Sequence, residues 1–261
     1  MSKKAERIRR MVADPAFIAG IHNYCDRWCQ RCSMTSRCSV FAMEQTESES
    51  CGDLEREDIG AQLIDILEAT AAMLQEMAEE MGIDLDQIPE DEADDQGRDE
   101  GRDHILVRSA MKYADGVRGW FDLWERRLAE TGVIGGSESR SELRVVGSGG
   151  KAAPARDLVE VILWYQPLIH AKLYRAVIGD ETLDGMENFP RDADGSAKVA
   201  LIAIERSTAA WSGLMKHFPQ AESNILDFLY QLERLRRATE WSFPNARAFV
   251  RPGFDDDAGE G

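Results

Sequence analysis

The chain is short of the residues and motifs on which common catalytic sites are built. Its 261 residues include four histidines and five cysteines. It has no Gly-rich phosphate loop, nucleophile elbow or dinucleotide-binding fingerprint. No Glu-x-x-His sequence occurs, which excludes the ligand pattern of ferritin-like di-iron bundles. No class of enzyme is therefore indicated by a sequence motif.

The chain also lacks an apolar run long enough to span a bilayer. Its basic start, residues 1–10, is followed by neither an apolar stretch nor a small-residue cleavage site. We therefore expect no signal peptide and no membrane partner. The cytoplasm is the expected compartment, and thiols stay reduced there.

Negative charge dominates the composition. The formal net charge is −17, and residues 1–40 carry eight Lys or Arg against three acids, so the rest of the chain carries −22. An acidic surface repels nucleic acid, which argues against nucleic acid as a partner. Residues 1–40 form a basic block, so DNA binding is retained as the least favoured alternative function. The same block contains the clustered cysteines.

Apolar residues recur with helical spacing along most of the chain. The pattern predicts long helices at residues 55–82, 104–130, 156–178, 196–217 and 221–241. The helix at 156–178 is apolar nearly all round, which predicts a central position. The predicted fold is all-α, a helical bundle of about five long helices with a cysteine-rich N-terminal helical cap.

Composition divides the chain into three parts. Residues 1–52 are the predicted metal-binding segment, residues 53–243 the helical bundle and residues 244–261 a flexible tail. Within the bundle, clustered acids predict a solvated linker at 84–103, and Gly and Ser predict a loop at 132–155.

Four of the five cysteines lie within fourteen residues. Cys25, Cys29, Cys32 and Cys38 have the spacing C-x3-C-x2-C-x5-C. On a helix the first three would share one face with His22. Thiolates gathered so closely repel one another unless a cation neutralises them, so we interpret the four cysteines as ligands of a metal centre. Two alternatives to a metal centre are less favoured. If the cysteines were ordinary buried residues, their close clustering would be a coincidence, and structural disulfides are disfavoured in the cytoplasm.

The spacing favours a [4Fe–4S] cluster over zinc. Zinc sites usually pair two C-x2-C units across a spacer, and this segment has one such unit without a distant partner. Iron–sulfur clusters often take three or four thiolates that are close in sequence. Cys51 would be a spare thiol or a substitute ligand. The neighbouring side chains that would tune potential and access are His22, Trp28, Arg27, Arg31 and Arg37.

Part of the segment resembles known iron–sulfur motifs. Cys29, Cys32 and Cys38 are similar to the C-x2-C-x5-C ending of WhiB-type regulators and to the cluster loop of endonuclease-III-type DNA glycosylases, over about ten residues. This resemblance implies a [4Fe–4S] cluster held among helices. Cys25 departs from both patterns, and no helix-hairpin-helix follows, so the DNA function is not implied. The run Tyr24–Cys29, YCDRWC, also resembles a motif of uncharacterised bacterial helical proteins.

The triplet formed by the first three cysteines also looks like the radical SAM signature. Radical SAM enzymes present that triplet on a loop after a strand of an α/β barrel. This chain shows no alternation of strands and helices and has a close fourth cysteine, so that class is excluded.

A second candidate site lies in the predicted bundle. Glu160 and His170 share the helix at 156–178, and Glu205 lies in the apolar run 199–206. A buried acid needs a partner. Either these three side chains line one polar pocket, or Glu205 pairs with a cation and holds two helices in register. The cations considered are Lys172, Arg175 and Arg206.

The functional prediction is an iron–sulfur protein in redox transfer or redox sensing, with a protein redox or signalling partner that the sequence does not identify. The first alternative is a structural zinc site in a helical interaction protein. The second is an enzyme with a polar pocket inside the bundle. No residue pattern predicts an oligomeric state.

Overall fold

The computed structural model describes residues 10–11, 14–50, 101–130, 153–181 and 192–255, with a few helical residues between 67 and 79. Every regular element among them is a helix, which confirms the all-α prediction. Most of the predicted helix 55–82, linker 84–103 and loop 132–155 lies outside the described residues. None of the described helices is both long and apolar enough to cross a bilayer.

The chain forms two compact units. The first combines residues 1–92 with residues 250–261, and the second spans residues 93–249. The sequence instead predicts boundaries after residues 52 and 243. Each unit is built differently, the first around short turns and the second around long helices.

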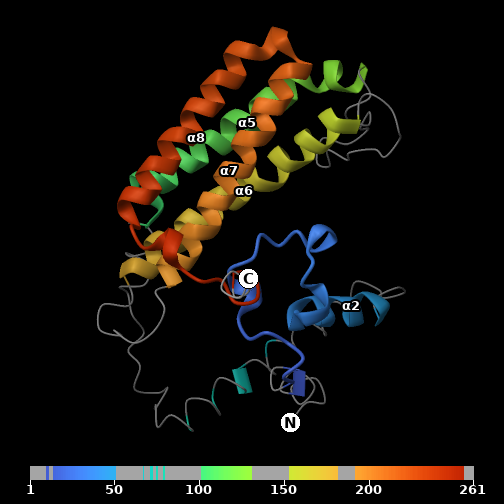
Figure 1. Cartoon of the computed structure of the whole chain (residues 1–261), viewed down its shortest axis with the longest axis vertical. Helices are drawn as coiled ribbons and strands as arrows, with labels where there is room; N and C mark the ends of the chain where they lie inside the picture. Colours follow the sequence, from blue (N-terminus) through green and yellow to red (C-terminus); the bar gives the residue numbers. More distant parts are fainter. Residues whose placement is uncertain are drawn as a thin grey trace, which may run out of the picture. The chain divides into compact units, whose positions relative to one another are not determined.

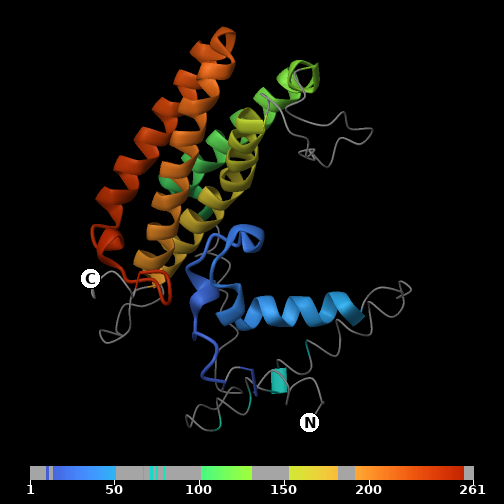
Figure 2. The same cartoon turned by 45° about the vertical axis from the view of Figure 1, so that its right-hand side comes forward.

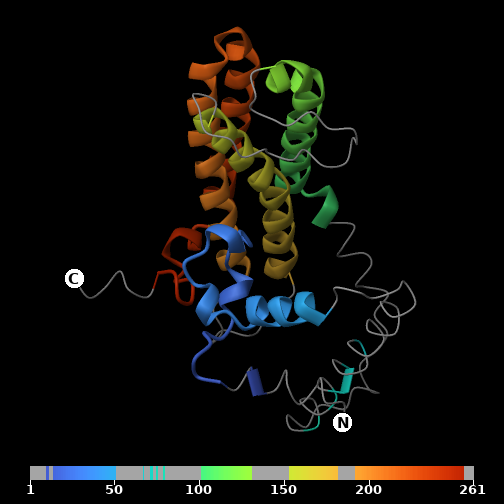
Figure 3. The same cartoon turned by 90° about the vertical axis from the view of Figure 1, so that its right-hand side faces the viewer.

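The second unit is a bundle whose four described helices run side by side in all views (Figure 1, Figure 2 and Figure 3). They are α5 (Ile105–Glu130), α6 (Ala153–Glu181), α7 (Asp192–His217) and α8 (Glu222–Ser242). α5 and α7 each contact both α6 and α8, so the four helices close a ring. Each begins and ends within about one turn of a predicted helix, because the apolar pattern repeats over many turns.

Aromatic side chains fill the core of the bundle. Trp211 of α7 is completely buried. Its ring packs edge-on against Trp120, with 5.2 Å between the ring centres, and nearly parallel to Phe228, with 4.6 Å between the ring centres. Its indole N–H donates a hydrogen bond of 2.9 Å to the hydroxyl of Tyr113. The rings therefore contribute apolar burial and pair geometry, and the indole N–H of Trp211 stays hydrogen-bonded.

The helix α7 begins at Asp192, one turn before the predicted start at 196. Acidic side chains in a first turn stabilise a helix N-terminus. Asp192 also accepts two hydrogen bonds from Arg175 of α6, at 2.8 and 2.7 Å. The small, fully buried side chains of Ala193 and Ala197 allow α6 to pack closely there.

The segment after α8 corrects the predicted flexible tail. Residues Ala246–Ala248 form a 3-10 helix, η6, that packs against α7. Arg247 pairs with Glu205 at 2.7 Å and with Glu240 at 2.6 Å. These contacts fix the chain to the bundle, whereas residues 256–261 lie outside the described residues.

The cysteine segment consists of turns rather than of one α-helix. Its elements before α2 (Ser39–Ser50) are η1 (Ile21–Asn23), η2 (Cys29–Arg31) and η3 (Thr35–Arg37). The backbone N–H of Trp28 donates to Oδ1 of Asp26 at 3.1 Å, and Arg27 between them has a φ of 57°. Side-chain bonds of this kind and positive φ values end helices. The prediction that the first three cysteines share a helix face is therefore wrong.

Residues 250–255 return to the cysteine unit and pack against its turns. Gly253 has a φ of +73°, which favours glycine. A Cβ at this position would lie 2.6 Å from Cδ1 of Ile18 and 3.0 Å from Cδ1 of Ile21. The close approach of the Gly253 backbone to these two isoleucine side chains therefore depends on the absence of a side chain at this position.

Candidate metal centre

The four clustered cysteines line one small cavity in the first unit. They are half-buried thiols, and the cavity that they border has a volume of about 20 Å³. The N–H of Cys32 donates to the carbonyl of Cys29 at 3.2 Å, and the N–H of Cys38 donates to the carbonyl of Thr35 at 3.3 Å. These tight turns end at Cys32 and Cys38, and cysteines that are separated in sequence reach the same cavity.

Two hydrogen bonds involve the sulfur atoms directly. The backbone N–H of Met34 donates to Sγ of Cys32 at 3.3 Å, and the thiol of Cys25 donates to the carbonyl of His22 at 3.4 Å. The sulfur of Cys32 thus acts as an acceptor, which is the role of a metal-bound thiolate. His22 itself borders the cavity with a half-buried side chain.

The apolar walls of the cavity come from a very small core. Ile21 and Trp28 are the only buried hydrophobic residues among the described residues of this unit, at 1% and 6% exposure. The guanidinium of Arg31 lies 4.2 Å from the centre of the Trp28 ring, and Phe254 borders the cavity from the C-terminal segment. Small units with so little apolar burial usually need disulfides or a metal.

The surroundings of the cavity oppose ionisation of the Cys29 thiol. Burial raises the pKa of the Cys29 thiol, and the Glu44 carboxylate and the three other cysteine sulfurs raise it further. Like charges oppose further ionisation, which a bound cation would reverse. The arginines expected to offset this charge have other contacts, since Arg27 lies 3.8 Å from Glu44 and Arg31 covers Trp28.

The donor set fits a metal centre, but the sulfur atoms do not converge on one point. Among the described residues, no three His, Cys, Asp or Glu side chains are grouped closely enough to hold a single ion. A zinc ion needs four ligands within about 2.0–2.3 Å of itself. A [4Fe–4S] cluster binds each thiolate at a different iron, so its thiolates stay farther apart. Cys51 follows the last residue of α2 and lies outside the described residues.

The structure does not assemble the second predicted site. Glu205 is 48% exposed and pairs with Arg247, so it is not a buried acid, and its ion-pair partner is none of the three predicted cations. His170 borders a cavity between α5 and α6 whose lining includes neither Glu160 nor Glu205. The predicted polar pocket is therefore wrong, because Glu205 faces outward from an apolar run.

Sequence reasoning missed the residues that reach the cysteine cavity from the C-terminus. Phe254 borders the cavity, and Gly253 makes the close approach possible. The segment contains one aromatic residue between Pro252 and a run of aspartates. Nothing in that local pattern indicates a contact with residues more than 200 positions away, so only the tertiary structure reveals it.

No protein-family model, curated protein or solved structure matches the chain. The resemblance of Cys29, Cys32 and Cys38 to helical iron–sulfur motifs therefore stays a prediction. The functional conclusion depends on the donor set and its cavity.

Proposed function

We propose that Cys25, Cys29, Cys32 and Cys38 ligate a metal centre, and that this centre is a [4Fe–4S] cluster used in redox transfer or redox sensing. The observation that carries the proposal is that four half-buried thiols line one cavity. Four reduced thiols at one place are the donor set of iron–sulfur and structural zinc sites.

The small apolar core of the first unit also supports a metal. Among the described residues of this unit, only Ile21 and Trp28 are buried hydrophobic side chains, and ordering of the turns costs conformational entropy. Metal binding supplies folding free energy in such units, about 10–16 kcal/mol for structural zinc in small peptides. The centre would therefore stabilise the turns that carry its own ligands.

The spacing of the cysteines along the sequence favours the cluster over zinc. The segment has a single C-x2-C unit without a distant second pair, and iron–sulfur clusters often take thiolates that are close in sequence. Half-buried cysteines also place the centre near the surface of the unit, where a protein partner or a small oxidant could exchange electrons with it. This accessibility supports a redox role.

Structural zinc is the second candidate, and the volume of the cavity favours it. A cavity of about 20 Å³ has room for roughly one water-sized group, whereas a cluster requires the thiols to move outward. In that case the protein would be an interaction module whose N-terminal segment is held together by the metal.

The test is anaerobic purification followed by an absorption spectrum and elemental analysis of the same sample. A [4Fe–4S] centre gives a brown protein with a broad band at the blue end of the visible range and about four iron and four sulfide ions per chain. A colourless protein with one zinc per chain supports the structural site and contradicts the redox role. A protein without metal contradicts both.

Single serine variants identify the ligands. Cys29→Ser and Cys38→Ser are expected to lose most of the bound metal, because each removes one of four ligands. Cys51→Ser is the matched control and is expected to keep the metal content of the unchanged chain. Equal metal content in all three variants would contradict the ligand assignment.

A further inference from the structure

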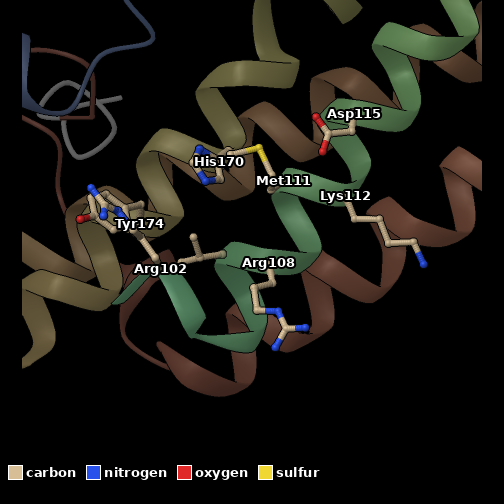
Figure 4. A pocket seen from close by; sticks show the side chains of 8 residues that line it. Arg102, Arg108, Met111, Lys112, Asp115, His170 and Tyr174 are labelled. Atoms are coloured by element: carbon tan, nitrogen blue, oxygen red, sulfur yellow. The ribbon is translucent and has the colours of Figure 1, made fainter. Parts of the chain in front are cut away.

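A second cavity, open to solvent, lies at the surface of the bundle between α5 and α6 and has a volume of about 580 Å³. Cavities of this size hold small organic molecules in other proteins. Figure 4 shows Met111 of α5 beside His170 of α6, with Asp115 at one end and Arg108 and Lys112 extending outward. The buried side chain of Val107 adds to the apolar part of the lining.

Positive charge dominates the rim of this cavity. Arg102, Arg108 and Lys112 line it, and Asp115 is the only carboxylate among the lining residues. Asp115 also forms an ion pair with Arg118, which reduces its effect on the cavity. The chain as a whole has a net charge of −17, so the positive charge of this site is opposite in sign to the charge of the whole chain.

The two cations on α5 have no carboxylate partner in the part of the chain that the structure describes. Arg108 and Lys112 are four residues apart on one helix, where like charges repel each other. Both also line the groove between α5 and α8, together with Arg234. A bound anion would reduce the repulsion between Arg108 and Lys112. Both side chains could attract it, because they line the cavity between α5 and α6 as well as the groove between α5 and α8.

A pair of rings forms another part of the lining. The rings of His170 and Tyr174 are nearly parallel, with an angle of 12° and 6.5 Å between their centres. Burial lowers the pKa of His170, the Asp115 carboxylate opposes this shift, and the Arg118 guanidinium adds to it. A lowered pKa favours the neutral form of an imidazole, which can both donate and accept a hydrogen bond.

Gly101 allows the turn before α5 to reach this pair of rings. A Cβ there would lie 3.0 Å from Cγ1 of Ile178 and 3.5 Å from Cε2 of Tyr174. The turn therefore packs directly on α6, and it carries Arg102 to the cavity. Charge and planar surface are thereby combined in one site.

We propose that this cavity binds a small organic anion in which a planar ring is joined to a phosphate or carboxylate group. The anionic group lies among Arg102, Arg108 and Lys112, and the ring lies against His170 and Tyr174. This site belongs to the bundle and does not depend on the proposed metal centre.

The experiment titrates the full-length protein at low ionic strength with anilinonaphthalene sulfonate, a fluorescent probe that joins planar rings to an anionic group. We expect saturable binding at about one site per chain, displacement by AMP, and weaker displacement by adenosine or inorganic phosphate alone. Lys112→Glu and Arg108→Glu should each weaken binding of the probe about tenfold, which corresponds to about 1.4 kcal/mol.

The matched control is Lys216→Glu, which makes the same charge change at an exposed lysine near the end of α7. It should change the affinity less than twofold. Circular dichroism would check that each variant keeps its helical content. The proposal is overturned if the probe does not bind saturably, if neither charge reversal weakens binding, or if Lys216→Glu weakens it equally.

Discussion

The close approach at Gly253 predicts that one methyl group controls access to the cysteines. In Gly253→Ala the new Cβ would lie 2.6 Å from Cδ1 of Ile18 and 3.0 Å from Cδ1 of Ile21, so either these side chains or the C-terminal segment must shift. The φ of +73° adds a cost of roughly 1–2 kcal/mol for a residue with a Cβ. With the displacement included, docking of residues 250–255 should weaken by about 1–3 kcal/mol, or about 5- to 150-fold in its equilibrium constant.

The assay is the rate of alkylation of Cys25–Cys38 by iodoacetamide, resolved by peptide mass spectrometry on the protein as purified. Phe254 borders the cavity that these thiols line, so a displaced segment should uncover them. When opening and closing are fast, the alkylation rate follows the open population. We therefore expect a faster reaction in Gly253→Ala by a factor within the calculated range.

The matched control is Gly20→Ala in the same unit. Gly20 has a nearly identical φ of +71°, but its Cβ would meet no atom closer than 3.7 Å. It carries the same backbone cost without the close approach, and it lies outside the C-terminal segment. If Gly253→Ala reacts no faster than Gly20→Ala, the segment does not cover the cysteines and the reasoning fails.

Two further predictions concern the stability of the bundle. Trp211→Phe leaves the completely buried hydroxyl of Tyr113 without its indole donor. This should lower the free energy of unfolding, measured in denaturant titrations, by about 1–3 kcal/mol. The control Trp241→Phe, at an 86% exposed position, should change the free energy of unfolding by less than about 0.5 kcal/mol. The hydrogen bond from Arg247 lowers the pKa of Glu240, so the stabilisation from this carboxylate is present above the unfolded pKa and is lost as the pH falls through the folded pKa. Glu240→Gln should therefore be less stable than the unchanged chain at about pH 7, by up to roughly 1 kcal/mol, and this difference should shrink as the pH falls through the folded pKa of Glu240. A difference that does not vary with pH would contradict this assignment.

The long helices of the bundle are predictable because their signal is repeated. An apolar residue at every third or fourth position over six or seven turns outweighs local exceptions, and Pro167 lies inside α6 without ending it. The start of α7 is less predictable, since the ion pair between Arg175 and Asp192 joins two helices. A contact between two helices can extend one of them, but the apolar periodicity of the sequence does not indicate it.

The gathering of the cysteines is predictable, but their conformation is not. Four cysteines within fourteen residues cannot separate far, whatever the backbone does. The single-face helix fails because the Asp26 side chain bonds to the backbone of Trp28 and the chain turns at Arg27. Both helix and turn are compatible with the same cysteine spacing, so spacing alone does not separate them.

By itself, the sequence determined the all-helical class, the four helices of the bundle and the identity of the candidate ligands, because each depends on residues that are neighbours along the chain. The tertiary structure decided the partner of Glu205, the return of Phe254 to the cysteines and the cavity that joins Arg108 to His170. These pairings link residues tens to hundreds of positions apart. These long-range pairings depend on how whole helices and turns pack together, and no local pattern of residues predicts them.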